Sequence, residues 1–183
     1  MGERNGAGLA LIGPRGTGKS TVGRLLAERL GRPFVDADHA LEERLGVSIA
    51  ELFRTHGEPY FRDEESATLR LLAAQPTPLV LATGGGVVLR EANRELLRRF
   101  GTVVWLTADP AVLAERLAAD PANDRPALTS LGALAEIRQI LAVREPLYRL
   151  AAHHIVATDG KSAESVADVI LATIAGRPPG GPR

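Results

Sequence analysis

The sequence of 183 residues contains no cysteine, and Lys19 and Lys161 are the only lysines among its 22 basic residues. The absence of cysteine excludes disulfides and thiolate chemistry. No apolar run approaches the roughly 20 residues that a membrane-spanning helix needs. A formal net charge of +0 gives no indication of a basic surface for nucleic acid or anionic lipid. We therefore expect a monomer that binds a small molecule and has no nucleic-acid or membrane partner.

The N-terminus, the histidines and the chain length set expectations for location and domain number. The first residues, MGERNGAG, lack the apolar core of a signal peptide, so we expect a cytoplasmic protein. The four histidines show no metal-ligand spacing. A mass of 19.4 kDa suits one domain with a sizeable core, which we assign to residues 1–175. The proline- and glycine-rich segment 176–183 is predicted to be a disordered tail.

Short apolar runs alternate along the chain with longer amphipathic runs. The short runs predict strands at 9–12, 33–37, 79–83, 102–107 and 154–158. The amphipathic runs predict helices at 19–30, 39–45, 48–55, 61–74, 91–99, 110–119, 131–150 and 162–175. This alternation is typical of a parallel sheet covered by helices on both faces, which is a three-layer α/β/α fold.

A glycine-rich loop lies between the first predicted strand and the first predicted helix. Gly13, Gly18, Lys19 and Ser20 satisfy the pattern G-x-x-x-x-G-K-[ST], whose backbone N–H groups cradle phosphates at a helix N-terminus. A lysine suits this loop because its compact charge reaches the β- and γ-phosphates where a planar guanidinium is too bulky. The Ser20 hydroxyl suits Mg²⁺. A helix-capping turn is the alternative interpretation. The residues expected to bind nucleotide phosphates are Gly16, Thr17, Gly18, Lys19, Ser20 and Thr21.

Two aspartates follow the second predicted strand. Because side chains alternate along a strand, Asp36 and Asp38 are expected to point to the same side, at the sheet edge where α/β folds bind ligands. One carboxylate would face a magnesium ion and the other a substrate hydroxyl. The alternative is that Asp38 caps the helix that follows it. Asp109, before Pro110, is interpreted as a helix N-cap with proline in the first turn.

Three consecutive glycines end the third predicted strand. Gly84, Gly85 and Gly86 fall at the same sheet edge as the phosphate loop. They form either a tight turn or a backbone cradle for a small polar ligand. Three glycines exceed what a turn needs, which favours the cradle.

Taken together, these stretches resemble shikimate kinase from about Leu9 to about Ala172. The resemblance implies a P-loop fold like that of nucleoside-monophosphate kinases, with a five-stranded parallel sheet in the order 2-3-1-4-5 and a mobile lid at about 116–128. It implies MgATP-dependent phosphorylation of the shikimate 3-hydroxyl, a step toward chorismate and the aromatic amino acids. The stretches that carry it are GPRGTGKSTVGRLLAERL, FVDADHALEERLGVSIAELFRTHGEPYFRDEE, GGG, DRPAL and REPLY.

The resemblance also implies a set of substrate-binding residues. Asp38 corresponds to the aspartate that binds the substrate hydroxyls and takes the proton of the attacked one. Arg62 and Arg144 correspond to the two arginines that hold the substrate carboxylate. Gly85, within the triple glycine, corresponds to a backbone donor to the substrate.

The nucleotide side is implied in the same way. Asp36 corresponds to the acid near the magnesium ion, and Arg125 to a lid arginine that reaches the ATP phosphates. Lys161 aligns with a basic residue beside the adenine, although a solvated turn lysine is the alternative. The segment between Arg116 and Arg125 is slightly longer than in common family members.

Three other functions are alternatives to shikimate phosphorylation. A kinase of another polyhydroxy acid, such as gluconate, would share the phosphate loop, but the aspartate with two arginines offers one hydroxyl site and one carboxylate site. A non-catalytic ligand sensor is disfavoured because Lys19, Asp36, Asp38 and Arg125 are all retained. A GTPase would need an N-K-x-D motif, and neither lysine lies in one.

Overall fold

The computed structural model describes residues 8–120 and 132–176, so Arg125, most of the predicted lid and most of the tail lie outside the described residues. Within them, five parallel strands form one sheet in the order β2-β3-β1-β4-β5, which confirms the predicted fold. The strands are β1 (Gly8–Ile12), β2 (Phe34–Asp36), β3 (Val80–Ala82), β4 (Gly101–Thr107) and β5 (His154–Ala157).

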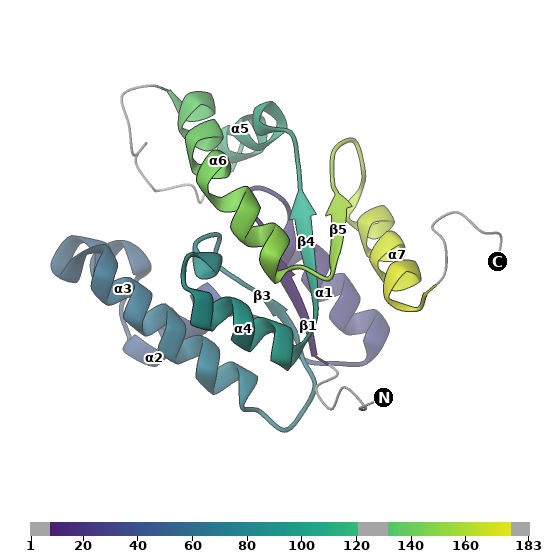
Figure 1. The fold of residues 1–183 in the computed structure, drawn as a ribbon, viewed down its shortest axis with the longest axis horizontal. Coiled ribbons are helices and arrows are strands. Elements are labelled where there is room, and N and C mark those ends of the chain that lie inside the picture. The colour runs from purple at the N-terminus through teal and green to yellow at the C-terminus, as the bar shows by residue number, and fades with distance from the viewer. Residues whose placement is uncertain (1–7, 121–131, 177–183) are drawn as a thin grey trace.

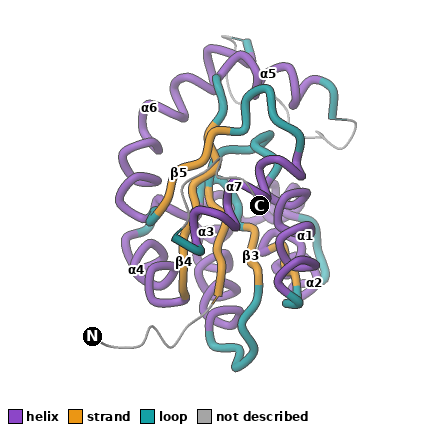
Figure 2. The backbone as a smooth tube through the Cα atoms, turned by 90° about the vertical axis from the view of Figure 1, so that its right-hand side faces the viewer, coloured by secondary structure: helices purple, strands orange, loops and turns teal. Residues whose placement is uncertain are grey.

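Helices cover both faces of this sheet, as Figures 1 and 2 show: α4 and α6 lie on one side of the strands and α1 on the other. Side chains point alternately to the two faces of the sheet along β1, so they pack against both helix layers. Ala10 and Ile12 pack in one core cluster with residues of α3, α4 and α6, while Leu9 and Leu11 pack in a second with α1 and α7. The helices are α1 (Lys19–Leu30), α2 (Ala37–Leu45), α3 (Ile49–Ala73), η1 (Val87–Leu89), α4 (Glu91–Phe100), α5 (Pro110–Ala118), α6 (Ala133–Ala151) and α7 (Ala163–Ile174).

Two differences from the predicted helices concern the segments around the site. Helix α2 begins at Ala37 rather than at 39, because the Asp36 carboxylate accepts hydrogen bonds from the backbone N–H groups of Asp38 and His39 and so caps the helix. The predicted helices 48–55 and 61–74 run together as α3, but the break between them exists: Gly57 has non-helical angles of φ 79 and ψ 176.

The sheet order brings the three sequence motifs together. Strands β2, β3 and β1 are neighbours, and each is followed directly by one motif: the aspartates, the triple glycine or the phosphate loop. Strand β4 leads to α5, where Asp109 caps the helix and Pro110 occupies its first turn, as predicted.

Candidate active site

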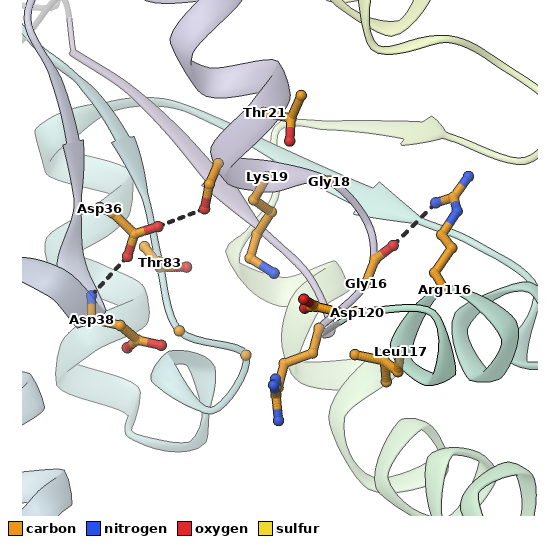
Figure 3. A pocket seen from close by; sticks show the side chains of 14 residues that line it. Gly16, Gly18, Lys19, Thr21, Asp36, Asp38, Thr83, Arg116, Leu117 and Asp120 are labelled. Atoms are coloured by element: carbon orange, nitrogen blue, oxygen red, sulfur yellow. Dashed lines mark hydrogen bonds between the residues drawn. The ribbon is translucent and has the colours of Figure 1, made fainter. Parts of the chain in front are cut away.

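A polar pocket of about 420 Å³ lies at the carboxyl ends of these strands (Figure 3). It is formed by the phosphate loop, the end of β2, the turn after β3 and the segment that includes the end of α5. Its lining residues are Arg15, Gly16, Gly18, Lys19, Ser20, Thr21, Asp36, Asp38, Thr83, Gly84, Gly85, Arg116, Leu117 and Asp120.

The phosphate loop requires glycine at fixed points. Gly16 and Gly18 have φ values of 81° and 85°, in the left-handed region that other residues rarely adopt. At Gly13 a Cβ atom would stand 2.3 Å from the Leu106 carbonyl oxygen. The Thr17 hydroxyl donates a hydrogen bond of 2.9 Å to the Pro14 carbonyl and so braces the loop. The sequence pattern thus corresponds to a closed loop at the start of α1.

Lys19 is nearly buried, and its side chain points into the space between Asp38 and the loop (Figure 3). Its ammonium group donates hydrogen bonds to the carbonyl oxygens of Gly13 at 2.9 Å and Pro14 at 2.7 Å. Burial lowers the pKa of Lys19 to about 8, although the negative charges of Asp38 and Asp36 act in the opposite direction. The loop therefore holds a lysine that is still mostly protonated at neutral pH.

Ser20 and the two aspartates form the next part of the site. The Ser20 hydroxyl donates a hydrogen bond of 2.5 Å to Asp36 Oδ2. The two aspartates were expected to point to the same side because of strand periodicity, but β2 ends at Asp36 and Asp38 lies in the first turn of α2. The helix cap is Asp36 rather than Asp38. Both aspartates nevertheless line the same pocket.

The triple glycine is explained by close approach rather than by backbone angles, since none of the three glycines has a positive φ. A Cβ atom at Gly84 would stand 2.6 Å from Asp38 Oδ1, and one at Gly86 would stand 2.2 Å from Arg62 Nη1. The backbone of this turn therefore lies directly against two side chains that the sequence assigned to the substrate.

Arg62 is fixed by an acid that sequence reasoning missed. Its guanidinium donates 2.8 Å and 3.0 Å hydrogen bonds to Glu65 and Glu58, and its side chain is only 12% exposed. Burial raises the pKa of Glu65, while the positive charge of Arg62 lowers it. Within the described part of the chain, Glu65 Oε1 has no hydrogen-bond partner. The spacing from Arg62 is three residues, which places both side chains on one helix face and was the available signal.

Arg144 joins this group from α6. Its positive charge lowers the pKa of Glu65, against the larger effect of burial, so it lies near the Arg62–Glu65 pair. Its positive charge also lowers the pKa of Tyr148, one helical turn farther along α6, against the larger effect of burial. Asp38, Glu65 and Arg62 therefore meet beside the triple glycine. Arg144 comes from a different helix, and its charge acts on Glu65.

Among the residues expected to contact the nucleotide, Lys161 is not brought to the pocket. Lys161 donates a 3.0 Å hydrogen bond to the Ala157 carbonyl and is not among the residues that line the pocket. Arg116, to which the sequence gave no role, donates to the Gly16 carbonyl at 3.1 Å and to the Thr158 carbonyl at 3.0 Å. It thereby ties the phosphate loop to the end of β5. Arg125 lies outside the described residues.

Comparisons with known proteins identify the family of this chain. The family model described as shikimate kinase matches residues 15–175. The shikimate kinase of Symbiobacterium thermophilum is 44% identical over 163 residues, which cover 89% of this chain and 93% of that protein. That of Paracidovorax citrulli is 48% identical over 158 residues, 85% of each chain. A structure of shikimate kinase from Acinetobacter baumannii in complex with shikimate superposes with a TM-score of 0.87 at 39% identity, covering 93% of both chains. With its sheet order, its phosphate loop and these relatives, the chain belongs to the shikimate kinase family.

Proposed function

We propose that this chain transfers the γ-phosphoryl group of ATP to the 3-hydroxyl of shikimate. The observation that carries the proposal is that the phosphate loop and Asp38 line one pocket, so that a donor phosphate and an acceptor hydroxyl would meet inside it. Shikimate kinases use ATP as their phosphoryl donor.

The phosphate loop supplies the nucleotide contacts. Its backbone N–H groups and the N-terminus of α1 favour phosphate oxygens, and Lys19 adds a positive charge toward the β- and γ-phosphates. Ser20 and Asp36 offer the oxygen ligands that Mg²⁺ prefers. Bound Mg²⁺ neutralises negative charge on the transferred group.

The acceptor side supplies orientation and proton transfer. Asp38 accepts the proton of the attacked hydroxyl, and Arg62 and Arg144 bind the substrate carboxylate through charge-assisted hydrogen bonds. Glu65 holds Arg62 in place. Arg125 reaches the phosphates and stabilises the charge that spreads over the transferred group in the transition state. Catalysis in this scheme is mostly positioning and electrostatics.

Other interpretations fit less well. A gluconate kinase is disfavoured because the relatives that match most of this chain are shikimate kinases. A non-catalytic sensor would leave Lys19 and Ser20 without a reaction. We also propose that the enzyme acts as a monomer in the cytoplasm, where ATP is available, without a nucleic-acid or membrane partner. Among the described helices none is both long and apolar enough to span a bilayer.

The test is a coupled assay of ADP release with shikimate, gluconate and quinate as candidate acceptors. We expect ADP formation that depends on shikimate and is absent in Lys19→Ala, whose melting temperature stays close to that of the wild type. A protein that binds ATP but forms no ADP with shikimate would contradict the proposal and favour the sensor. Preference for gluconate would favour the alternative kinase.

A further inference from the structure

Tyr148 is a fully buried side chain whose hydroxyl reaches the candidate active site. It lies on α6, one turn after Arg144, and has 0% of its surface exposed. Its hydroxyl donates a hydrogen bond of 2.5 Å to the carbonyl oxygen of Gly85 in the middle of the triple glycine. None of the predicted roles includes this tyrosine.

Gly85 lies between the phosphate loop and Tyr148. A Cβ atom placed there would stand 3.5 Å from the Gly13 carbonyl oxygen, 3.6 Å from Pro14 Cα and 3.6 Å from the Tyr148 hydroxyl. The carbonyls of Gly13 and Pro14 are the same groups that hold the Lys19 ammonium. The turn therefore packs against the phosphate loop, and the Gly85 carbonyl in this turn accepts the hydrogen bond of Tyr148.

The tyrosine ring is itself held in place. It stacks on Trp105 with ring centroids 5.5 Å apart and an interplanar angle of 24°. Trp105 Cδ1 in turn lies 3.4 Å from where a Cβ of Gly13 would stand. These packing contacts involve only the rings, so removal of the hydroxyl alone leaves them intact.

The hydroxyl remains protonated under ordinary conditions. Burial raises the pKa of Tyr148 to about 12, although the positive charge of Arg144 lowers it. A phenol that stays neutral keeps the proton that it donates to the Gly85 carbonyl. The hydroxyl is therefore bonded to the triple glycine, one helical turn from an arginine assigned to the substrate carboxylate.

We infer that Tyr148 is a positioning residue for the acceptor: its hydroxyl holds the Gly85 carbonyl and so fixes the turn that lies against the phosphate loop. The inference rests on the proposed function, because it assigns the acceptor subsite to shikimate. Tyr148 acts through Gly85 and does not touch the transferred group.

The test compares Tyr148→Phe with Tyr60→Phe. Tyr60 is the other tyrosine of the chain and is 38% exposed, so its variant is a matched control. In Tyr148→Phe we expect the KM for shikimate to rise about five- to tenfold, the effect of one lost buried hydrogen bond. The KM for ATP should stay within about twofold, and Tyr60→Phe should match the wild type in both constants. Fluorescence of Trp105, the only tryptophan, gives shikimate affinity without turnover.

Several outcomes would overturn the inference. An unchanged KM for shikimate with a lower melting temperature would show that Tyr148 contributes only to the stability of the core. Failure of Tyr148→Phe to fold would show the same. Equal increases in both KM values would show a general disturbance of the pocket. Failure of the proposed function looks different, because the wild type itself would then show no activity with shikimate.

Discussion

Replacement of Gly86 by alanine adds one methyl group at the contact between the triple glycine and Arg62. The new Cβ atom would stand 2.2 Å from Arg62 Nη1, 2.4 Å from Nη2 and 2.5 Å from Cζ, so the whole guanidinium must move. Because Gly86 has a φ of −95°, alanine adopts its backbone angles without strain. The perturbation is therefore steric and is directed at a single side chain.

The structure sets the size of the effect. Displacement of the guanidinium breaks its 2.8 Å hydrogen bond to Glu65 and moves it away from the proposed carboxylate site. A charge-assisted hydrogen bond to the substrate contributes about 1.5–3 kcal/mol. Its loss corresponds to about a ten- to hundredfold rise in the KM for shikimate. The KM for ATP should change little, because Arg62 is not among the residues that line the pocket beside the phosphate loop.

The assay is steady-state ADP release with each substrate varied in turn, together with thermal unfolding. Gly31→Ala is the matched control: Gly31 has a φ of 61° and no atom within 4 Å of an added Cβ. It should lower the melting temperature, because alanine is strained there, and leave both KM values unchanged. If Gly86→Ala folds and keeps its KM for shikimate within about twofold of the wild type, a difference of about 0.4 kcal/mol, the proposed role of Arg62 is wrong.

Further predictions concern single groups of the site. Arg62→Ala and Arg144→Ala should each raise the Kd for shikimate about ten- to hundredfold without weakening ATP binding, as measured by calorimetry. Asp38→Asn should lower kcat strongly in the ADP-release assay, because an amide cannot accept the hydroxyl proton. Arg125→Ala should lower kcat at least about a hundredfold with shikimate affinity nearly unchanged; a loss below about threefold would remove its assigned role. Since the pKa of Lys19 is lowered to about 8, its charge is present below that pH and lost above it, so the Kd for ATP should rise from pH 7 to pH 9, and a flat profile would contradict this.

The sheet order and the phosphate loop could be predicted from the sequence. The loop pattern is local, because Gly16 and Gly18 need left-handed backbone angles wherever this loop forms. The sheet order followed from the resemblance rather than from the strand pattern. Asp36 and Asp38 line one pocket, but strand periodicity is not the reason, because β2 stops at Asp36. Since Asp36 caps α2, the alternation of strand side chains ends before Asp38.

Glu65 and Tyr148 could not be found by pattern alone. Their positions relative to the pocket depend on how α3 and α6 pack beside the turn after β3, and that packing joins segments far apart in the sequence. Their spacing from Arg62 and Arg144, three and four residues, becomes meaningful only once those arginines are placed. The resemblance placed Lys161 beside the adenine, which stays a prediction; in the structure its ammonium group donates to the Ala157 carbonyl.

Identification of the reaction product is the most direct test of the proposed activity. The purified protein is incubated with MgATP and shikimate, and the products are identified by ³¹P NMR. The coupling between phosphorus and the ring protons shows which hydroxyl carries the phosphate. The account predicts ADP and one phosphate ester, attached at the 3-position of shikimate, in equal amounts. Inorganic phosphate without an ester, an ester at another hydroxyl, or unchanged shikimate with ATP bound would contradict it.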